Sequence, residues 1–164
     1  MRILVKPALI KLGLVTFCAL ASASAVQAQD APPNPEEALQ KAVETRQAVF
    51  KLIDFNSQQV MGMLKKVPFD AATAQKVGAR IEALAPMISE TFATDTRKAT
   101  SVKTKAREGI WTNMADFKAK NDDLVKAGQA LSAAAKTGDK GATMKAIVGV
   151  GKACSGCHDN YRDK

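Results

Sequence analysis

Histidine and cysteine are scarce in this 164-residue sequence. The single histidine, His158, is followed by six residues, and two of the three cysteines, Cys154 and Cys157, precede it in the segment Cys-Ser-Gly-Cys-His. A single histidine excludes a metal site with two histidine ligands. It also disfavours zinc, because zinc normally needs four Cys, His or carboxylate ligands and this segment offers three.

Strand patterns and catalytic arrangements are missing as well. No strand pattern surrounds the two cysteines, although a thioredoxin-like Cys-x-x-Cys pair would lie in a βαβ unit. The sequence has no Ser-His-Asp set, no phosphate-binding loop and no convergent carboxylates. We therefore expect that the protein is not an enzyme.

The Cys-Ser-Gly-Cys-His segment suits covalent haem attachment. Each thiol of Cys154 and Cys157 forms a thioether with one porphyrin vinyl group, and His158 becomes an axial ligand of the iron. On a helix these three residues share a face, since they are three or four positions apart. The sequence therefore predicts one covalently attached haem c, with His158 as the metal ligand. The alternative is a non-haem helical protein whose two cysteines form a disulfide or a metal site.

The first 28 residues have the composition of a secretory signal peptide. An apolar run from Leu12 to Val26 follows basic residues, and Val26-Gln27-Ala28 is a suitable cleavage site. The run is shorter than the ~20 residues that span a bilayer. We expect a cleaved signal peptide at 1–28, a mature domain at 29–164, a periplasmic location and no membrane span after cleavage. Because bacterial haem attachment takes place outside the cytoplasm, this expectation agrees with the haem motif.

The net charge is modest. The formal value of +8 falls to +5 when Arg2, Lys6 and Lys11 leave with the signal peptide. Two haem propionates would lower it to about +3, which gives no indication of a nucleic-acid partner. The remaining positive charge could favour acidic redox partner proteins.

Four segments carry apolar residues at alternating steps of three and four, which is typical of amphipathic helices. These segments follow Asn34, Asp70, Arg107 and Asp139, and they end near Pro68, Thr91, Gly138 and the C-terminus. Asn34, Asp70 and Asp139 are expected N-caps, and Pro86 is expected to kink or loosen the second helix. Residues 91–107 have no periodicity and form a connecting loop. The sequence thus predicts an all-α, antiparallel four-helix bundle, a fold that places cofactors between facing helices.

Two arginines attract attention because of their positions. Arg46 interrupts the apolar stripe of the first helix, so it needs an anionic partner, which a haem propionate would supply. The alternative is a side chain that snorkels past the end of the bundle. Arg162 lies one turn after His158, where it could reach the proximal side of the iron or a propionate, or simply lie in solvent.

The sequence resembles the cytochrome c′ family, which is a class of c-type cytochromes, in three places. The segments are Cys-Ser-Gly-Cys-His-Asp-Asn-Tyr-Arg at the C-terminus, Thr45-Arg46-Gln47-Ala48-Val49-Phe50 in the first helix, and Ile110-Trp111 at the third. The resemblance covers the chain from about Pro35 onward. It implies that Arg46 and Gln47 approach the haem edge and its propionates, and that Phe50 occupies the distal face.

The same resemblance implies further properties. It makes a second, proximal ligand site beside Arg162 possible, and it suggests a homodimer through the first two helices. We expect exposed apolar positions such as Val60 or Ile88 to serve that interface. It also implies binding of small gases, especially nitric oxide, and periplasmic electron transfer.

The residue at position 50 determines how many ligands we expect the iron to have, and here it is Phe50. A related low-spin branch of the family has methionine at this position, whereas phenylalanine has no donor atom. Met61 is eleven residues further on, or about 16 Å along a helix, too far to substitute. We therefore expect a five-coordinate iron in an apolar site, which favours nitric oxide and carbon monoxide over dioxygen. The alternative is a low-spin, simple electron carrier of the same family.

Overall fold

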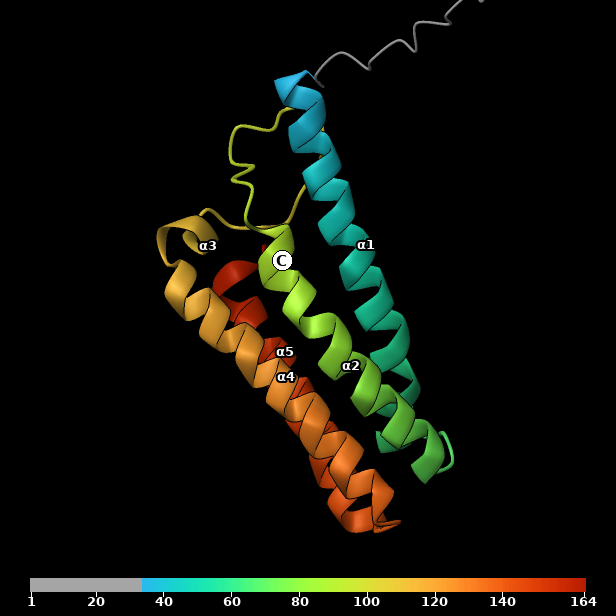
Figure 1. Ribbon diagram of the computed structural model, residues 1–164. Coiled ribbons are helices and arrows are strands. Elements are labelled where there is room, and N and C mark those ends of the chain that lie inside the picture. Colours follow the sequence, from blue (N-terminus) through green and yellow to red (C-terminus); the bar gives the residue numbers. More distant parts are fainter. Residues whose placement is uncertain (1–33) are drawn as a thin grey trace, which may run out of the picture. The chain divides into compact units, whose positions relative to one another are not determined.

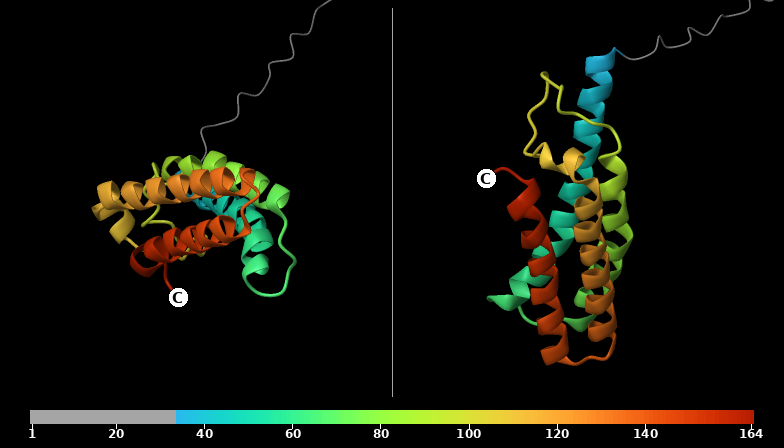
Figure 2. Two further views of the ribbon diagram at one scale, coloured as in Figure 1. Left: turned by 90° about the horizontal axis from the view of Figure 1, so that it is seen from below. Right: turned by 90° about the vertical axis from the view of Figure 1, so that its left-hand side faces the viewer.

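Four long helices form an antiparallel bundle in the computed structural model of the chain, which describes residues 34–164 (Figure 1). They are α1 (Pro35–Met61), α2 (Ala71–Thr91), α4 (Met114–Lys136) and α5 (Lys140–Tyr161). Two short elements accompany them, the 3₁₀ turn η1 (Gly62–Leu64) and α3 (Gly109–Thr112). The views in Figure 2 show α5 beside α4. The predicted all-α bundle is confirmed, and the expected signal peptide lies outside the described residues.

The helix starts follow the predicted capping residues. Asn34 Oδ1 accepts a hydrogen bond from the Glu36 amide at 3.1 Å, and Pro35 occupies the first helical position. The carboxylates of Asp70 and Asp139 accept from main-chain amides of α2 and α5, each at 3.0 Å. These bonds satisfy amides that have no partner within the helix.

Three predictions of helix boundaries need correction or refinement. The third predicted helix is divided, because Asn113 has a non-helical backbone (φ −137°, ψ 54°) between α3 and α4. The first helix tightens into η1 at Gly62. Pro86, which was expected to kink or loosen the second helix, lies inside α2, and the helix continues to Thr91.

The closest helix crossing joins α2 and α4 through two glycines. A Cβ atom on Gly78 would lie 2.4 Å from the Ser132 amide nitrogen and 2.8 Å from the Gly128 carbonyl oxygen. A Cβ on Gly128 would lie 2.8 Å from the Glu82 nitrogen. The two backbones are therefore in direct contact. By contrast, α1 and α5 make few contacts with each other, which leaves room between them.

The connecting loop after α2 is fastened at two points. The Glu36 carboxylate accepts hydrogen bonds from the amides of Thr100 (2.8 Å) and Ser101 (2.6 Å). At the end of the loop, Arg107 forms an ion pair with Asp163 at 2.9 Å. The loop was correctly predicted to lack periodic structure, but its path is fixed by these specific bonds.

The positions expected to serve a dimer interface are buried in the core. Val60 is 0% exposed and Ile88 is 5% exposed, so that expectation is wrong. Both lie on the faces by which α1 and α2 pack within the bundle. The exposed large apolar residues of these helices are Phe50, Leu52, Phe55 and Met87. No helix within residues 34–164 is long and apolar enough to cross a membrane.

Candidate haem site

A cleft of about 620 Å³ lies among α1, α4, α5 and the connecting loop. This volume is within the usual range for small-molecule and cofactor sites. The structure brings all seven residues singled out from the sequence to the walls of this cleft. They are Arg46, Gln47, Phe50, Cys154, Cys157, His158 and Arg162.

The wall formed by α5 carries the two thiols and the imidazole. Cys154 and Cys157 are free and partly buried, so the disulfide of the alternative interpretation is not formed. Burial raises the pKa of both thiols, and Lys120 partly offsets this for Cys157. In the described part of the chain, there is no cluster of three or more Cys, His, Asp or Glu side chains that could hold a metal ion.

The surroundings of His158 favour its neutral form. Burial, and then the positive charge of Arg162, lower the pKa of the imidazole, while Asp159 acts in the opposite direction. Arg162 Nη1 lies 3.4 Å from His158 Nδ1. A neutral imidazole has the lone pair that a metal ligand needs.

Arg46 forms part of the α1 wall and is only 2% exposed, so it does not snorkel into solvent. Its Nη1 donates to Thr96 Oγ1 at 2.7 Å, and Nη2 donates to the carbonyls of Thr91 and Thr94 at 3.3 Å. These acceptors are all neutral. The Nε–H is buried and has no partner in the protein. One hydrogen-bond donor of a buried cation is therefore still available in the wall of the cleft.

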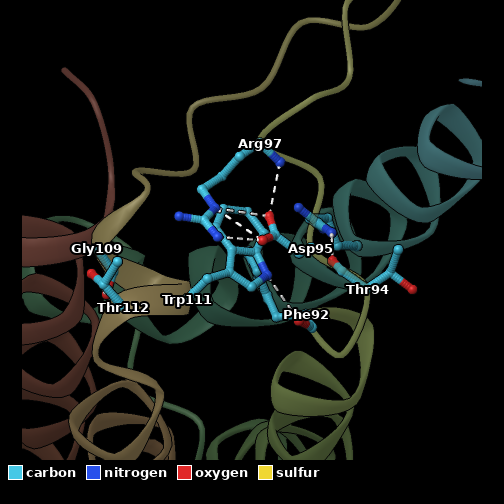
Figure 3. Close-up of polar contacts among 8 residues, drawn as sticks. Phe92, Thr94, Asp95, Arg97, Gly109, Trp111 and Thr112 are labelled. Carbon is cyan, nitrogen blue, oxygen red and sulfur yellow. Dashed lines mark hydrogen bonds and ion pairs between the residues drawn. The ribbon is translucent and has the colours of Figure 1, made fainter.

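Aromatic rings surround this guanidinium group. Its carbon lies 4.2 Å from the centroid of the Phe92 ring and 5.5 Å from that of Trp111, distances at which a cation is attracted to the ring face. Trp111 Nε1 donates to the Phe92 carbonyl at 3.1 Å (Figure 3). Figure 3 also shows the Asp95–Arg97 ion pair on the same segment. The loop after α2 thus holds Arg46 in one orientation.

Gln47 and Phe50 complete the predicted part of the α1 wall. Gln47 Nε2 donates to the Lys103 carbonyl at 3.0 Å, which ties α1 to the connecting loop. Phe50 is 37% exposed and lines the cleft. Its ring meets that of Phe92 edge-to-face at 6.4 Å. An aromatic ring, without a donor atom, therefore occupies this part of the wall.

Sequence reasoning missed several residues that also line the cleft. Met61, which the sequence analysis considered only as a ligand too distant to replace Phe50, is one of them, and its sulfur lies 3.8 Å from the position that a Cβ on Gly151 would take. Another is Tyr161, whose hydroxyl donates to Asp116 Oδ2 at 2.5 Å. Burial and this carboxylate raise the pKa of Tyr161 to about 12. Asn121 is also present; its only sequence signal was a polar residue within the apolar stripe of the third predicted helix.

The residues present fit a haem group. Two thiols and a neutral imidazole share one wall, a buried cation with a free N–H lies in another, and the remaining lining is largely apolar. Covalent haem attachment needs the two thiols and the imidazole. A haem propionate can accept a hydrogen bond from the free N–H of the buried cation.

Comparisons with known proteins agree with this geometry. The family model described as Cytochrome C' matches residues 41–162. The cytochrome c' of Rubrivivax gelatinosus is 39% identical over 125 residues, which cover 75% of this chain and 95% of that protein. A nitric oxide complex of a mutant cytochrome c prime from Alcaligenes xylosoxidans has a TM-score of 0.67 at 30% identity, covering 77% of this chain and 97% of that one.

A further solved structure bears on assembly. It is a cytochrome c' with a ligand-controlled dimer dissociation, and it has a TM-score of 0.69 at 29% identity. The similarity covers 82% of this chain and all of that one.

Proposed function

The chain belongs to the cytochrome c′ family, and on that premise we propose that it is a periplasmic protein that binds small gases at a five-coordinate haem iron and takes part in electron transfer. Proteins of this family carry one covalently attached haem c. The haem supplies an iron that changes between the ferric and ferrous states and holds a diatomic ligand. The roles of this chain's own residues follow from the cleft.

Cys154 and Cys157 would hold the haem by thioether bonds, and His158 would ligate its iron. The support for these roles is that all three side chains line the same wall of the cleft. The lowered pKa of His158 keeps the imidazole unprotonated and able to bind a metal. Arg162, next to the imidazole, disfavours its protonation and thereby preserves this ligand.

Arg46 and Gln47 stabilise the propionate side of the haem. Arg46 offers its remaining Nε–H, in a buried environment where a charge-assisted hydrogen bond to a carboxylate is strong. Gln47 acts through its bond to Lys103, which keeps the connecting loop beside the cleft. The two residues thus have different roles, one binding and one positioning.

The gas-binding proposal rests on one observation: His158 and Phe50 line the same cleft. Phenylalanine cannot supply a sixth ligand. The one methionine among the lining residues, Met61, lies against Gly151 on the same helix as His158. Gly151 precedes His158 by seven residues, or about 10 Å along the helix, so Met61 is poorly placed to supply a second ligand to an iron held by His158. The iron would therefore keep an open position for a gas.

Electron transfer to acidic partner proteins is supported by the charge of the cleft walls. Lys51, Lys105, Lys120 and Arg162 line the cleft, and Asp54 is the only carboxylate among the described lining residues. Positive charge at the site of the redox group would favour encounter with a negatively charged partner.

An optical spectrum of the ferrous protein, recorded with and without carbon monoxide, tests the proposal. We expect a five-coordinate spectrum that changes on addition of the gas. A six-coordinate iron that ignores carbon monoxide would instead indicate the low-spin electron carrier. Colourless protein with the apoprotein mass, after expression in a host that matures c-type cytochromes, would indicate the non-haem alternative.

A further inference from the structure

Arg162 is held beside His158 although it lies beyond the end of the helix that carries His158. The helix α5 ends at Tyr161, and Arg162 has an extended backbone (φ −126°, ψ 131°). Its Nη1 nevertheless lies 3.4 Å from His158 Nδ1. A residue beyond a helix end lacks the helical hydrogen bonds that would fix its direction. Another part of the chain must therefore place this side chain.

Two main-chain hydrogen bonds flank Arg162. On one side of it, the Arg107 amide donates to the Tyr161 carbonyl at 3.1 Å. On the other side, the Asp163 amide donates to the Lys105 carbonyl at 2.9 Å. Together they form an antiparallel bridge centred on Arg162. The end of the connecting loop thus fixes the backbone direction at this residue.

The Arg107 side chain binds the same segment a second time. Its Nε forms an ion pair with Asp163 Oδ1 at 2.9 Å. Its Nη1 donates to the carbonyls of Asp159 and Asn160 at 3.0 and 3.4 Å. These carbonyls belong to the last turn of α5, where a cation interacts favourably with the helix dipole. One arginine therefore holds the turn before Arg162 and the residue after it.

Arg162 places a positive charge beside the residue that we propose as the iron ligand. A cation near the iron favours the ferrous form, because the ferric form carries one more positive charge. Groups around an iron ligand tune the reduction potential in this way. The Coulomb energy falls as the separation increases, so the effect is lost if Arg162 turns away into solvent.

We propose that Arg107 is a positioning residue for the redox site: together with the main-chain bridge, it holds Arg162 against His158 and so raises the reduction potential of the haem iron. This inference rests on the function proposed above. It makes the place of Arg162, rather than the charges of the two residues that hold it, the quantity that matters at the iron.

The reduction potential of the holoprotein, followed by its optical spectrum, tests this in two variants with opposite changes of charge. Arg107→Met removes a positive charge, and Asp163→Ala removes a negative one. If these charges acted directly on the iron, the potential would fall in the first variant and rise in the second. Because both variants break the ion pair and release Arg162, we expect it to fall in both. Arg80→Met, at an exposed position outside the cleft, is the control and should leave the potential unchanged.

A double variant separates position from charge. Arg162→Gln should lower the potential by itself, and adding Arg107→Met should then change it little, because no charge is left to position. A fall of equal size in both backgrounds, or opposite shifts in Arg107→Met and Asp163→Ala, overturns the inference.

The apoprotein gives a readout that does not depend on haem. The Asp163 amide should exchange with D₂O about two- to fivefold faster in Arg107→Met than in wild type, the range expected for loss of an exposed ion pair. An unchanged exchange rate overturns the inference alone. Protein without haem, after expression in a host that matures c-type cytochromes, overturns both this inference and the proposed function.

Discussion

Arg46 Nη1 donates a hydrogen bond to Thr96 Oγ1 at 2.7 Å, joining residues that are fifty positions apart in the sequence. Both side chains are 2% exposed. The bond fixes the connecting loop to the α1 wall of the cleft, and the Nε–H of the same guanidinium remains free. Arg46 therefore serves the fold and the cofactor site at the same time.

Replacement of Arg46 by methionine should destabilise the protein with or without haem. The change leaves Thr96 and the carbonyls of Thr91 and Thr94 without their donor. Unpaired buried groups of this kind cost about 1–3 kcal/mol each, so we expect a loss of about 2–4 kcal/mol after partial relaxation. Urea unfolding of the apo and holo proteins measures it. A loss confined to the holoprotein would mean that Arg46 acts only on the propionates. Arg97→Met is the control, since its ion pair with Asp95 is exposed and exposed ion pairs contribute little to stability.

The Glu36 carboxylate should make stability depend on pH in the acidic range. Hydrogen bonds from Ser101, first, and from Thr100 lower the pKa of Glu36 from 4.5 to about 2. Between these two values the unfolded state binds the proton and the folded state does not. The stabilisation is therefore complete above about pH 4.5 and is lost as the pH falls toward about 2.

Chemical unfolding of wild type and Glu36→Gln from pH 7 down to pH 2 checks this. The difference in the free energy of unfolding should shrink steadily below pH 4.5. A constant difference over that range would show that the carboxylate charge plays no part. Glu37→Gln, in the same first turn of α1, is the control for general charge effects.

The contact between α2 and α4 should not tolerate a methyl group. Gly78→Ala and Gly128→Ala each place a Cβ within 3.0 Å of backbone atoms of the other helix. Although alanine is the better helix former, overpacking of this kind costs about 1–3 kcal/mol. Thermal unfolding measures the loss. Gly149→Ala is the matched control: a Cβ there meets nothing within 4 Å, so we expect stabilisation of up to about 1 kcal/mol from helix propensity.

Assembly through the first two helices, as the family resemblance suggests, would use their exposed apolar side chains. Phe55 and Leu52 on α1 are 63% and 52% exposed. If they form the dimer interface, Phe55→Lys should yield monomers at concentrations where the wild type is dimeric, as measured by sedimentation velocity. Val148→Lys on α5, at a position that is 42% exposed, should leave the mass unchanged. Equal dissociation in both variants would argue against this interface.

Local sequence signals predicted more of this structure than long-range ones did. Asn34, Asp70 and Asp139 act on amides two or three residues away, so their caps could be predicted from the sequence. The partners of Arg46 lie on a loop without periodicity, and only the folded chain brings them together. A stripe with steps of three and four also identified the general face of α1. The stripe did not predict that Val49 is buried in the core and that Phe50 lines the cleft.

Phe50 should control how fast gas enters the site. Its ring lines the cleft together with His158, and no atom of the ring can bind iron. Removing the ring in Phe50→Ala takes away the steric barrier at the open face, so we expect faster association of carbon monoxide, measured by flash photolysis. Phe55→Ala removes a phenylalanine from the same helix outside the cleft and should leave the rate unchanged. Phe50→Met adds the missing sulfur and should convert the ferrous spectrum to six-coordinate and low-spin. If Phe50→Ala left the association rate unchanged and Phe50→Met left the iron five-coordinate, Phe50 would not face the iron, and the distal wall would have to be assigned to other residues.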